Sequence, residues 1–132
     1  MNKVKHLIKL KRKAFKLWSE KVRLIGMCEL CGVKYKEITP KGKPVILNAH
    51  HLLDRYSFPR LSWDIKNGIC VCQYCHKFSK TGCHRGSIIF NEWYRLKYPE
   101  NYQYLLKVYN EPVEITVEYM ENIIKILSQM DK

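Results

Sequence analysis

Two pairs of cysteines with identical spacing are the residues whose arrangement points most directly to chemistry. Cys28 and Cys31 form one Cys-x-x-Cys unit, and Cys72 and Cys75 form a second. Zinc in structural sites takes four ligands in a tetrahedron, and two such units supply four thiolates. The spacing therefore predicts that these four cysteines bind one structural zinc ion, with residues 32–71 looping out between the two units.

Two further cysteines leave alternatives open. Cys70 could replace Cys72 as a ligand, because residues two apart lie on one face of an extended chain. Cys72 is preferred because it completes the standard spacing with Cys75, and Cys83 is expected only to pack as a small apolar residue. Four unrelated buried thiols or a redox dithiol are the other interpretations. Two equally spaced pairs without a surrounding βαβ pattern favour zinc over both.

The other candidates for chemistry lie inside and just after the insert. They are His50, His51, Asn67, His76 and His84. Cleavage of a phosphodiester needs a divalent metal that neutralises charge and assists the leaving oxygen. It also needs a general base that activates water, and histidine has a suitable pKa. Because Cys75 directly precedes His76, the zinc would hold one part of such a site in place.

The elements that must position these residues can be read from the hydrophobic pattern. Residues 3–25 predict a basic amphipathic helix that ends at Gly26, and its expected apolar face is Val4, Ile8, Phe15, Trp18, Val22 and Ile25. Residues 45–53 predict a strand that runs into the two adjacent histidines. A second strand is expected over residues 68–72, followed by a short helix over residues 73–81 that Gly82 ends.

Three more helices are expected in the C-terminal part. The first covers residues 87–97, the second starts at Pro99, and the third has Thr116 as its N-cap. This last helix is acidic and is expected to pack on the basic part of the chain or to contact a protein partner. The fold class is therefore α+β in a single domain of residues 1–132. It divides into a basic helix (1–26), a zinc-bound core (27–86) and a helical C-terminal part (87–132).

The charge of the chain indicates its class of partner. Its 132 residues include 24 Lys and Arg against 12 Asp and Glu, which gives a net charge of +12. Such an excess favours nucleic acid, a dense line of phosphates, and an anionic membrane surface is the weaker alternative. We find no apolar run long enough to span a bilayer and no signal peptide. The chain is therefore expected in a reducing cytosol, where cysteines are more often thiols or metal ligands than disulfides.

Three segments together resemble the HNH endonuclease family. They are Asn-Ala-His-His-Leu-Leu at 48–53, Trp-Asp-Ile-Lys-Asn-Gly-Ile-Cys at 63–70, and Cys-Gln-Tyr-Cys-His-Lys at 72–77. More narrowly, they resemble small phage-type members with a four-cysteine zinc site, and the resemblance covers residues 28–93. It implies a ββα-metal core, in agreement with the predicted order of strand, strand and short helix. It also implies hydrolysis of DNA with Mg²⁺ or Mn²⁺ as the catalytic ion, in a host cell's cytosol if the chain is phage-encoded.

The resemblance also implies a role for each candidate. His51 resembles the general base, and His50 and His76 resemble ligands of the catalytic metal, although the two adjacent histidines could exchange roles. Asn67 matches the middle Asn of the family, which binds metal in some members and in others holds the loop and the base. Asn67-Gly68 is also a strong turn signal, and the two interpretations are compatible. His84 is an additional candidate, because several relatives have a histidine there.

Basic residues flank the proposed site as candidate phosphate contacts: Arg55, Arg60, Lys66, Lys77, Lys80 and Arg85. The N-terminal helix could lie along DNA, or pack by its aromatic face and present lysines outward. The alternative function is a zinc-stapled DNA-binding module without activity, or an accessory subunit of a phage DNA-packaging or recombination complex. A homodimer or a phage protein partner is compatible with each of these functions.

Overall fold

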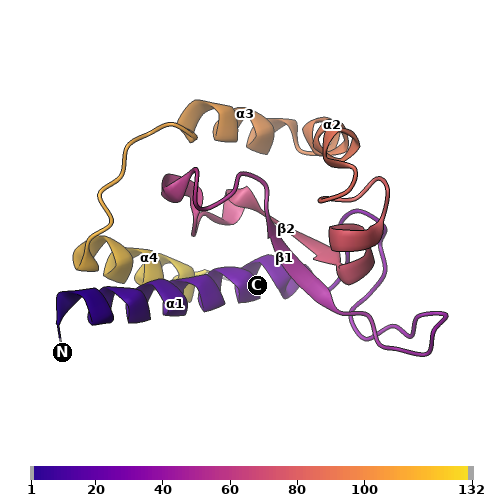
Figure 1. Ribbon diagram of the computed structural model, residues 1–132, viewed down its shortest axis with the longest axis horizontal. Helices are drawn as coiled ribbons and strands as arrows, with labels where there is room; N and C mark the ends of the chain where they lie inside the picture. The colour runs from indigo at the N-terminus through magenta and orange to yellow at the C-terminus, as the bar shows by residue number, and fades with distance from the viewer. Residues whose placement is uncertain (1, 131–132) are drawn as a thin grey trace.

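The computed structural model describes residues 2–130, so Met1, Asp131 and Lys132 at the ends of the predicted domain lie outside the described residues. Its helices are α1 (Lys3–Val22), α2 (Ser87–Lys97), α3 (Pro99–Val108) and α4 (Val117–Gln129), and its strands are β1 (Leu47–His51) and β2 (Gly68–Cys72). The predicted α+β class is confirmed. The β-hairpin lies between the pair α1 and α4 on one side and the pair α2 and α3 on the other (Figure 1). Within residues 2–130, no helix is both long and apolar enough to cross a membrane.

Helix α1 forms where the sequence predicts it, but it buries a different stripe of residues. The Asn2 side chain caps the helix by accepting a hydrogen bond from the Lys5 amide at 2.9 Å. The residues of α1 that pack against the rest of the protein are Leu7, Leu10, Ala14, Phe15, Leu17, Trp18 and Val22. The expected face was wrong at both of its ends, because Val4 is 66% exposed, Ile8 44% and Ile25 53%. Leucines lie on more than one side of this helix, so the sequence pattern alone is compatible with two different apolar faces. Packing against α4 determines which face is buried.

The two strands pair antiparallel, with His51 opposite Gly68 and Leu47 opposite Cys72. Strand β1 is shorter than predicted at both ends. The Val45 amide instead donates to the Glu37 carbonyl, within the loop that projects beyond the strands. At the other end, the backbone of Leu53 bonds to the side chain of Asn67. The hairpin therefore contains little more than the two short segments that carry His50, His51 and Cys72.

Trp18 is the centre of the core beneath this hairpin. Its side chain is fully buried, and its Nε1 donates to the Asp64 carbonyl at 2.8 Å. Its ring stacks on His51, with centroids 3.9 Å apart and planes 10° apart. The opposite face of the hairpin packs on α2, where Phe90 contacts the edge of His50. Each of the two histidines is thus packed against an aromatic side chain from a different helix.

The segment after β2 is not the regular helix that was predicted for residues 73–81. It forms one π-helical turn, Tyr74–Phe78, and residues 79–86 then fold back onto it. Gly82 permits this, because a Cβ there would lie 1.9 Å from the Cys75 carbonyl oxygen. Backbone hydrogen bonds run from the Cys83 amide to the Cys75 carbonyl and from the His84 amide to the His76 carbonyl. Residues 83 and 84 therefore lie beside residues 75 and 76.

The C-terminal helices are close to their predicted positions. Pro99 occupies the first turn of α3, and the Thr116 hydroxyl caps α4 by accepting from the Tyr119 amide at 3.0 Å. Helix α4 packs along α1, which is the first of the two arrangements expected for the acidic helix (Figure 1). Glu118 and Glu121 of α4 share a groove there with Lys3 of α1.

We expect Gly68→Ala to destabilise the fold by about 1–3 kcal/mol, as overpacking does in a well-packed core. A Cβ at this position would lie 2.5 Å from Val22 Cγ2 and 2.8 Å from Trp18 Cζ2. Urea denaturation measures the loss. Val22→Ala removes one of the two groups that the new Cβ would meet. Gly68→Ala should therefore cost less stability in the Val22→Ala background than in the wild type. Equal unfolding midpoints for the wild type and Gly68→Ala would show that α1 does not press on the sheet as described.

Candidate functional site

The four predicted cysteines come together in one cluster. The sulfur atoms of Cys28, Cys31, Cys72 and Cys75 all lie within 4.8 Å of one another, and Cys31 Sγ lies 3.7 Å from Cys72 Sγ. Thiolates that bind one zinc ion tetrahedrally at about 2.3 Å lie about 3.8 Å apart. The cluster could therefore bind a single zinc ion.

The chain around these cysteines has the local geometry of a metal knuckle. The amide of Cys31 points to Cys28 Sγ and that of Cys75 to Cys72 Sγ, both at 3.4 Å. Gly32 turns the chain after the first pair with a φ of 85°, which side chains disfavour. Burial raises the pKa of Cys31 to about 11, so a neighbouring cation would be needed to hold it as a thiolate at neutral pH.

Cys70, which the sequence left as an alternative ligand, lies outside this cluster. Its amide donates to a carboxylate oxygen of Glu29 at 2.8 Å, and the Glu29 amide donates back to the Cys70 carbonyl. The same carboxylate accepts from the Tyr98 hydroxyl at 2.5 Å. Glu29 therefore connects the first cysteine knuckle to β2 and to the junction of α2 and α3.

Three histidines form a second cluster, separate from the cysteines. Ring nitrogens of His50, His76 and His84 lie within 4.8 Å of one another, and Nε2 of His76 is 3.0 Å from Nε2 of His84. Nδ1 of His76 is buried and has no hydrogen-bond partner among the described residues. These imidazoles make few hydrogen bonds to other protein groups, so their nitrogens are available to a cation. The three residues therefore fit a metal ion. The backbone pairing of residues 83–84 with 75–76 is what brings His84 into the cluster.

The electrostatics of this cluster favour neutral imidazoles. Burial, together with the nearby rings of His76 and His84, lowers the pKa of His50 to about 3. Burial and His84 lower the pKa of His76 to about 4. Neutral imidazole is the form that binds metal ions. At neutral pH His50 and His76 therefore present nitrogen lone pairs rather than positive charges.

His51 lines the same cleft of about 430 Å³ as the three histidines but is held by different groups. Its Nε2 lies 2.8 Å from the carbonyl oxygen of buried Ser62, which can only accept, so Nε2 carries the proton. That tautomer leaves Nδ1 as the basic nitrogen. Burial lowers the pKa of His51, and the hydrogen bond to Ser62 opposes this shift. The ring is therefore neutral, fixed in one tautomer, and stacked on Trp18.

Asn67 is fully buried, and its amide is engaged by the backbone. Its Oδ1 accepts from the Leu53 amide at 2.9 Å, and its Nδ2 donates to the carbonyls of Leu53 and Leu61 at 2.9 and 3.1 Å. With these bonds made, Asn67 ties both ends of the loop between the strands together. The geometry agrees with the role of holding the loop and gives no support to the role of metal ligand.

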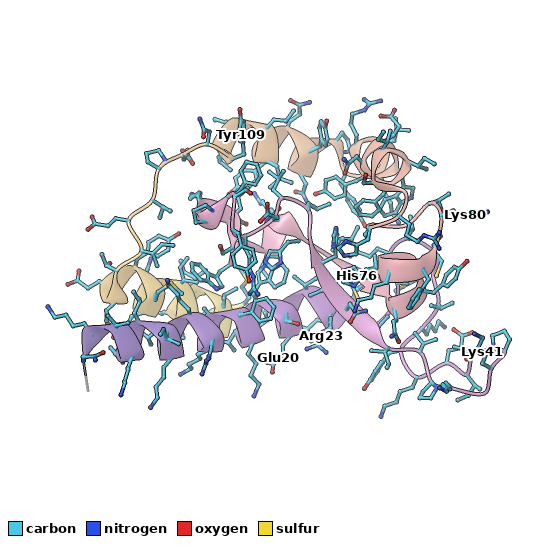
Figure 2. All side chains as sticks on the ribbon, in the orientation of Figure 1. Glu20, Arg23, Lys41, His76, Lys80 and Tyr109 are labelled. Atoms are coloured by element: carbon cyan, nitrogen blue, oxygen red, sulfur yellow. The ribbon has the colours of Figure 1, made fainter. Side chains whose placement is uncertain are left out.

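The predicted phosphate contacts do not all face the cleft. Arg55 lines it, and Lys77 and Lys80 are exposed on the π-helical turn and the segment after it, where Lys80 extends outward (Figure 2). Arg85 is also exposed and donates to the Phe78 carbonyl at 3.3 Å. Lys66 lies over the ring of Tyr104 instead.

Arg60 was predicted to contact DNA beside the histidines, and its position argues against this. It pairs with Asp64 at 3.5 Å and with Glu111 at 3.7 Å, beside a separate cavity under α4. Its charge is offset by these acidic groups, one of them distant in the sequence, which is why the local pattern did not reveal them.

Three groups at the site were not foreseen as functional. Trp18 was expected in the core of the N-terminal helix, but nothing in its spacing showed that it would stack on His51. The carbonyl of Ser62 has no signature in the sequence. Tyr56 had no predicted role, although it follows Arg55 directly and lines the cleft. Contacts between segments that are apart in the sequence decide the positions of Trp18 and Ser62.

Replacing Cys72 by Ser should lower the zinc content of the purified protein by one ion per chain and lower its melting temperature, because a structural zinc contributes directly to folding. Inductively coupled plasma mass spectrometry and thermal unfolding measure the two effects. Cys70→Ser is the matched control, because Cys70 is also buried and only two residues away but lies outside the cluster. Zinc loss in Cys70→Ser with full retention in Cys72→Ser would reverse the assignment.

Asn67→Asp keeps the shape of the side chain but removes the amide hydrogens that the carbonyls of Leu53 and Leu61 accept. We expect a loss of about 2 kcal/mol in the free energy of unfolding, because one buried and one partly buried carbonyl lose their donor. Denaturant titration measures this, and limited proteolysis should cut residues 53–61 faster. Asn110→Asp, at an exposed position, is the control. Equal stability of the two variants would contradict the role assigned to Asn67.

Comparison with known proteins gives no relative for this chain: no family model, no curated protein and no solved structure matches it significantly. Its function must therefore be argued from the two clusters and the cleft.

Proposed function

We propose that this protein is a metal-dependent DNA endonuclease of the HNH type, with a ββα-metal core and a structural zinc site. The observation that carries the proposal is the convergence of His50, His76 and His84 beside His51 in one cleft. Strand β1 carries His50 and His51, the π-helical turn after β2 carries His76, and the segment that folds back onto this turn carries His84. The net charge of +12 suits a polyanionic substrate.

His51 is the proposed general base. Its Nε2 proton is held by the Ser62 carbonyl, so Nδ1 can take a proton from the water that attacks phosphorus. Stacking on Trp18 fixes the plane of the ring, which keeps that nitrogen in one direction. Asn67 acts as a positioning residue, because it closes the loop that contains Ser62.

His50, His76 and His84 would hold the catalytic divalent ion, which neutralises charge on the phosphate and assists the leaving oxygen. Three imidazoles favour ions such as Zn²⁺ or Ni²⁺, whereas Mg²⁺ and Mn²⁺ prefer oxygen ligands. This donor set gives less support to the Mg²⁺ or Mn²⁺ expected from the sequence. His50 is placed among the ligands rather than His51, because only His50 joins the other two rings.

Cleavage of supercoiled plasmid DNA tests the proposal. Wild-type protein should nick DNA with at least one of Mg²⁺, Mn²⁺, Zn²⁺ and Ni²⁺, and His51→Ala should lower the rate by about 10²–10⁴-fold, as the loss of a general base does. His50→Ala should also abolish cleavage, and it should weaken binding of the added metal in isothermal titration calorimetry. His51→Ala should leave that binding intact.

His6→Ala is the control, because His6 is an exposed histidine of α1 outside both clusters. If wild-type protein cuts DNA with none of these ions, the endonuclease proposal fails. If the protein then still binds DNA, the alternative of a zinc-stapled binding module stands in its place. If His51→Ala cuts as fast as wild type, another group is the base.

A further inference from the structure

A second groove opens directly beside the histidine cleft. It has a volume of about 610 Å³, and it shares Phe15, Arg55 and Tyr56 with that cleft. Lys11 and Arg12 of α1 also line it. A chain bound at the histidines could therefore continue into this groove without leaving the surface.

An aromatic and cationic stack separates the two hollows. The guanidinium carbon of Arg55 lies 4.6 Å from the centre of the Phe15 ring and 5.2 Å from that of Tyr56. Arg55 therefore covers one face of Tyr56. The tyrosine is nevertheless 83% exposed, so its other face is open to solvent. A flat ring that is backed by a cation and open on one side is a platform on which a nucleobase can stack.

The platform stands on a fixed turn. One oxygen of the Asp54 carboxylate accepts hydrogen bonds from the amides of Tyr56 and Ser57 at 2.8 and 3.1 Å. The Phe58 amide donates to the Asp54 carbonyl at 2.9 Å. The backbone that carries Tyr56 is therefore ordered before any ligand arrives, which lowers the entropy cost of binding.

The charge of the groove suits phosphates. Among the described residues that line it, three are cations (Lys11, Arg12 and Arg55) and none is a carboxylate. Arg60 and Asp64, which neutralise each other, line a different cavity. A ligand with a flat apolar ring and a neighbouring anionic group therefore matches the groove better than an apolar or a cationic ligand does.

We propose that this groove is a subsite for an unpaired nucleotide of the strand to be cut. Its base stacks on the open face of Tyr56, and its phosphates contact Arg55, Lys11 and Arg12. Inside a paired duplex both faces of each base are covered by neighbouring bases, so the interior of a duplex cannot use the platform. The preferred substrate class is therefore single-stranded or locally unpaired DNA. This inference rests on the proposed function for the identity of the strand.

Binding without added divalent ion tests the subsite separately from cleavage. Fluorescence anisotropy of the zinc-loaded full-length protein compares a labelled single strand, its blunt duplex, and a duplex with an internal unpaired loop. Tyr56→Leu should weaken binding of the single strand and the looped duplex by about tenfold to a hundredfold, as the loss of base stacking does, and leave the blunt duplex unchanged. Tyr56→Phe keeps the ring and should bind as wild type does.

Tyr35→Leu is the matched control, because Tyr35 is also an exposed tyrosine, at 56%, but lies on the loop away from both hollows. A single strand with 2-aminopurine reports stacking directly: wild type should quench its fluorescence, and Tyr56→Leu should not. Equal loss for duplex and single strand, or no loss in Tyr56→Leu, overturns the subsite even if the protein cuts DNA. Failure to cut DNA with these binding effects intact would overturn the nuclease proposal instead.

Discussion

The pairing register of two five-residue strands is the constraint on which both clusters depend. Because side chains alternate along a strand, His50 and His51 point to opposite faces of the hairpin. His50 meets His76 and His84 on the face covered by Phe90, and His51 meets Trp18 on the face covered by α1. A shift of one residue would exchange the two rings. The proposed division between base and ligand is therefore a property of the register.

Interactions at both ends of the hairpin hold this register. At one end, Asn67 bonds to the amide and the carbonyl of Leu53, just beyond the last paired residues. At the other end, Cys72 lies opposite Leu47 and belongs to the cysteine cluster. A bound zinc ion would affect the histidines by fixing their positions rather than by its charge. The ion would hold Cys75, which directly precedes His76. The backbone of residues 75 and 76 bonds in turn to residues 83 and 84, so the same turn would fix both His76 and His84.

Much of this arrangement could be predicted because it is encoded in local spacing. Two Cys-x-x-Cys units specify four ligands, and adjacent histidines in a strand specify opposite directions without any knowledge of the fold. The interactions that could not be predicted connect distant segments. The pairing of Arg60 with Glu111 and the hydrogen bond from His51 to Ser62 depend on how the loop after β1 folds over the sheet. The π-helical turn depends on Gly82, whose lack of a Cβ lets residues 79–86 close onto Cys75.

Helix α1 links the proposed chemistry to the proposed binding of the strand. Lys11, Phe15 and Trp18 are spaced four and three apart, which places them on one side of the helix. Trp18 is buried under His51, Phe15 lies beside the guanidinium of Arg55, and Lys11 lines the adjacent groove. The lysines on its opposite side, such as Lys9 and Lys13, remain exposed, so the helix packs by its aromatic face and also presents positive charge outward. Since α1 is one continuous helix packed along α4, it carries both Trp18, which orients the proposed base, and two of the three cations that would contact the strand, Lys11 and Arg12. In the proposed nuclease, the packing of this helix and the Asp54 turn that carries Tyr56 together set the position of the substrate relative to the base.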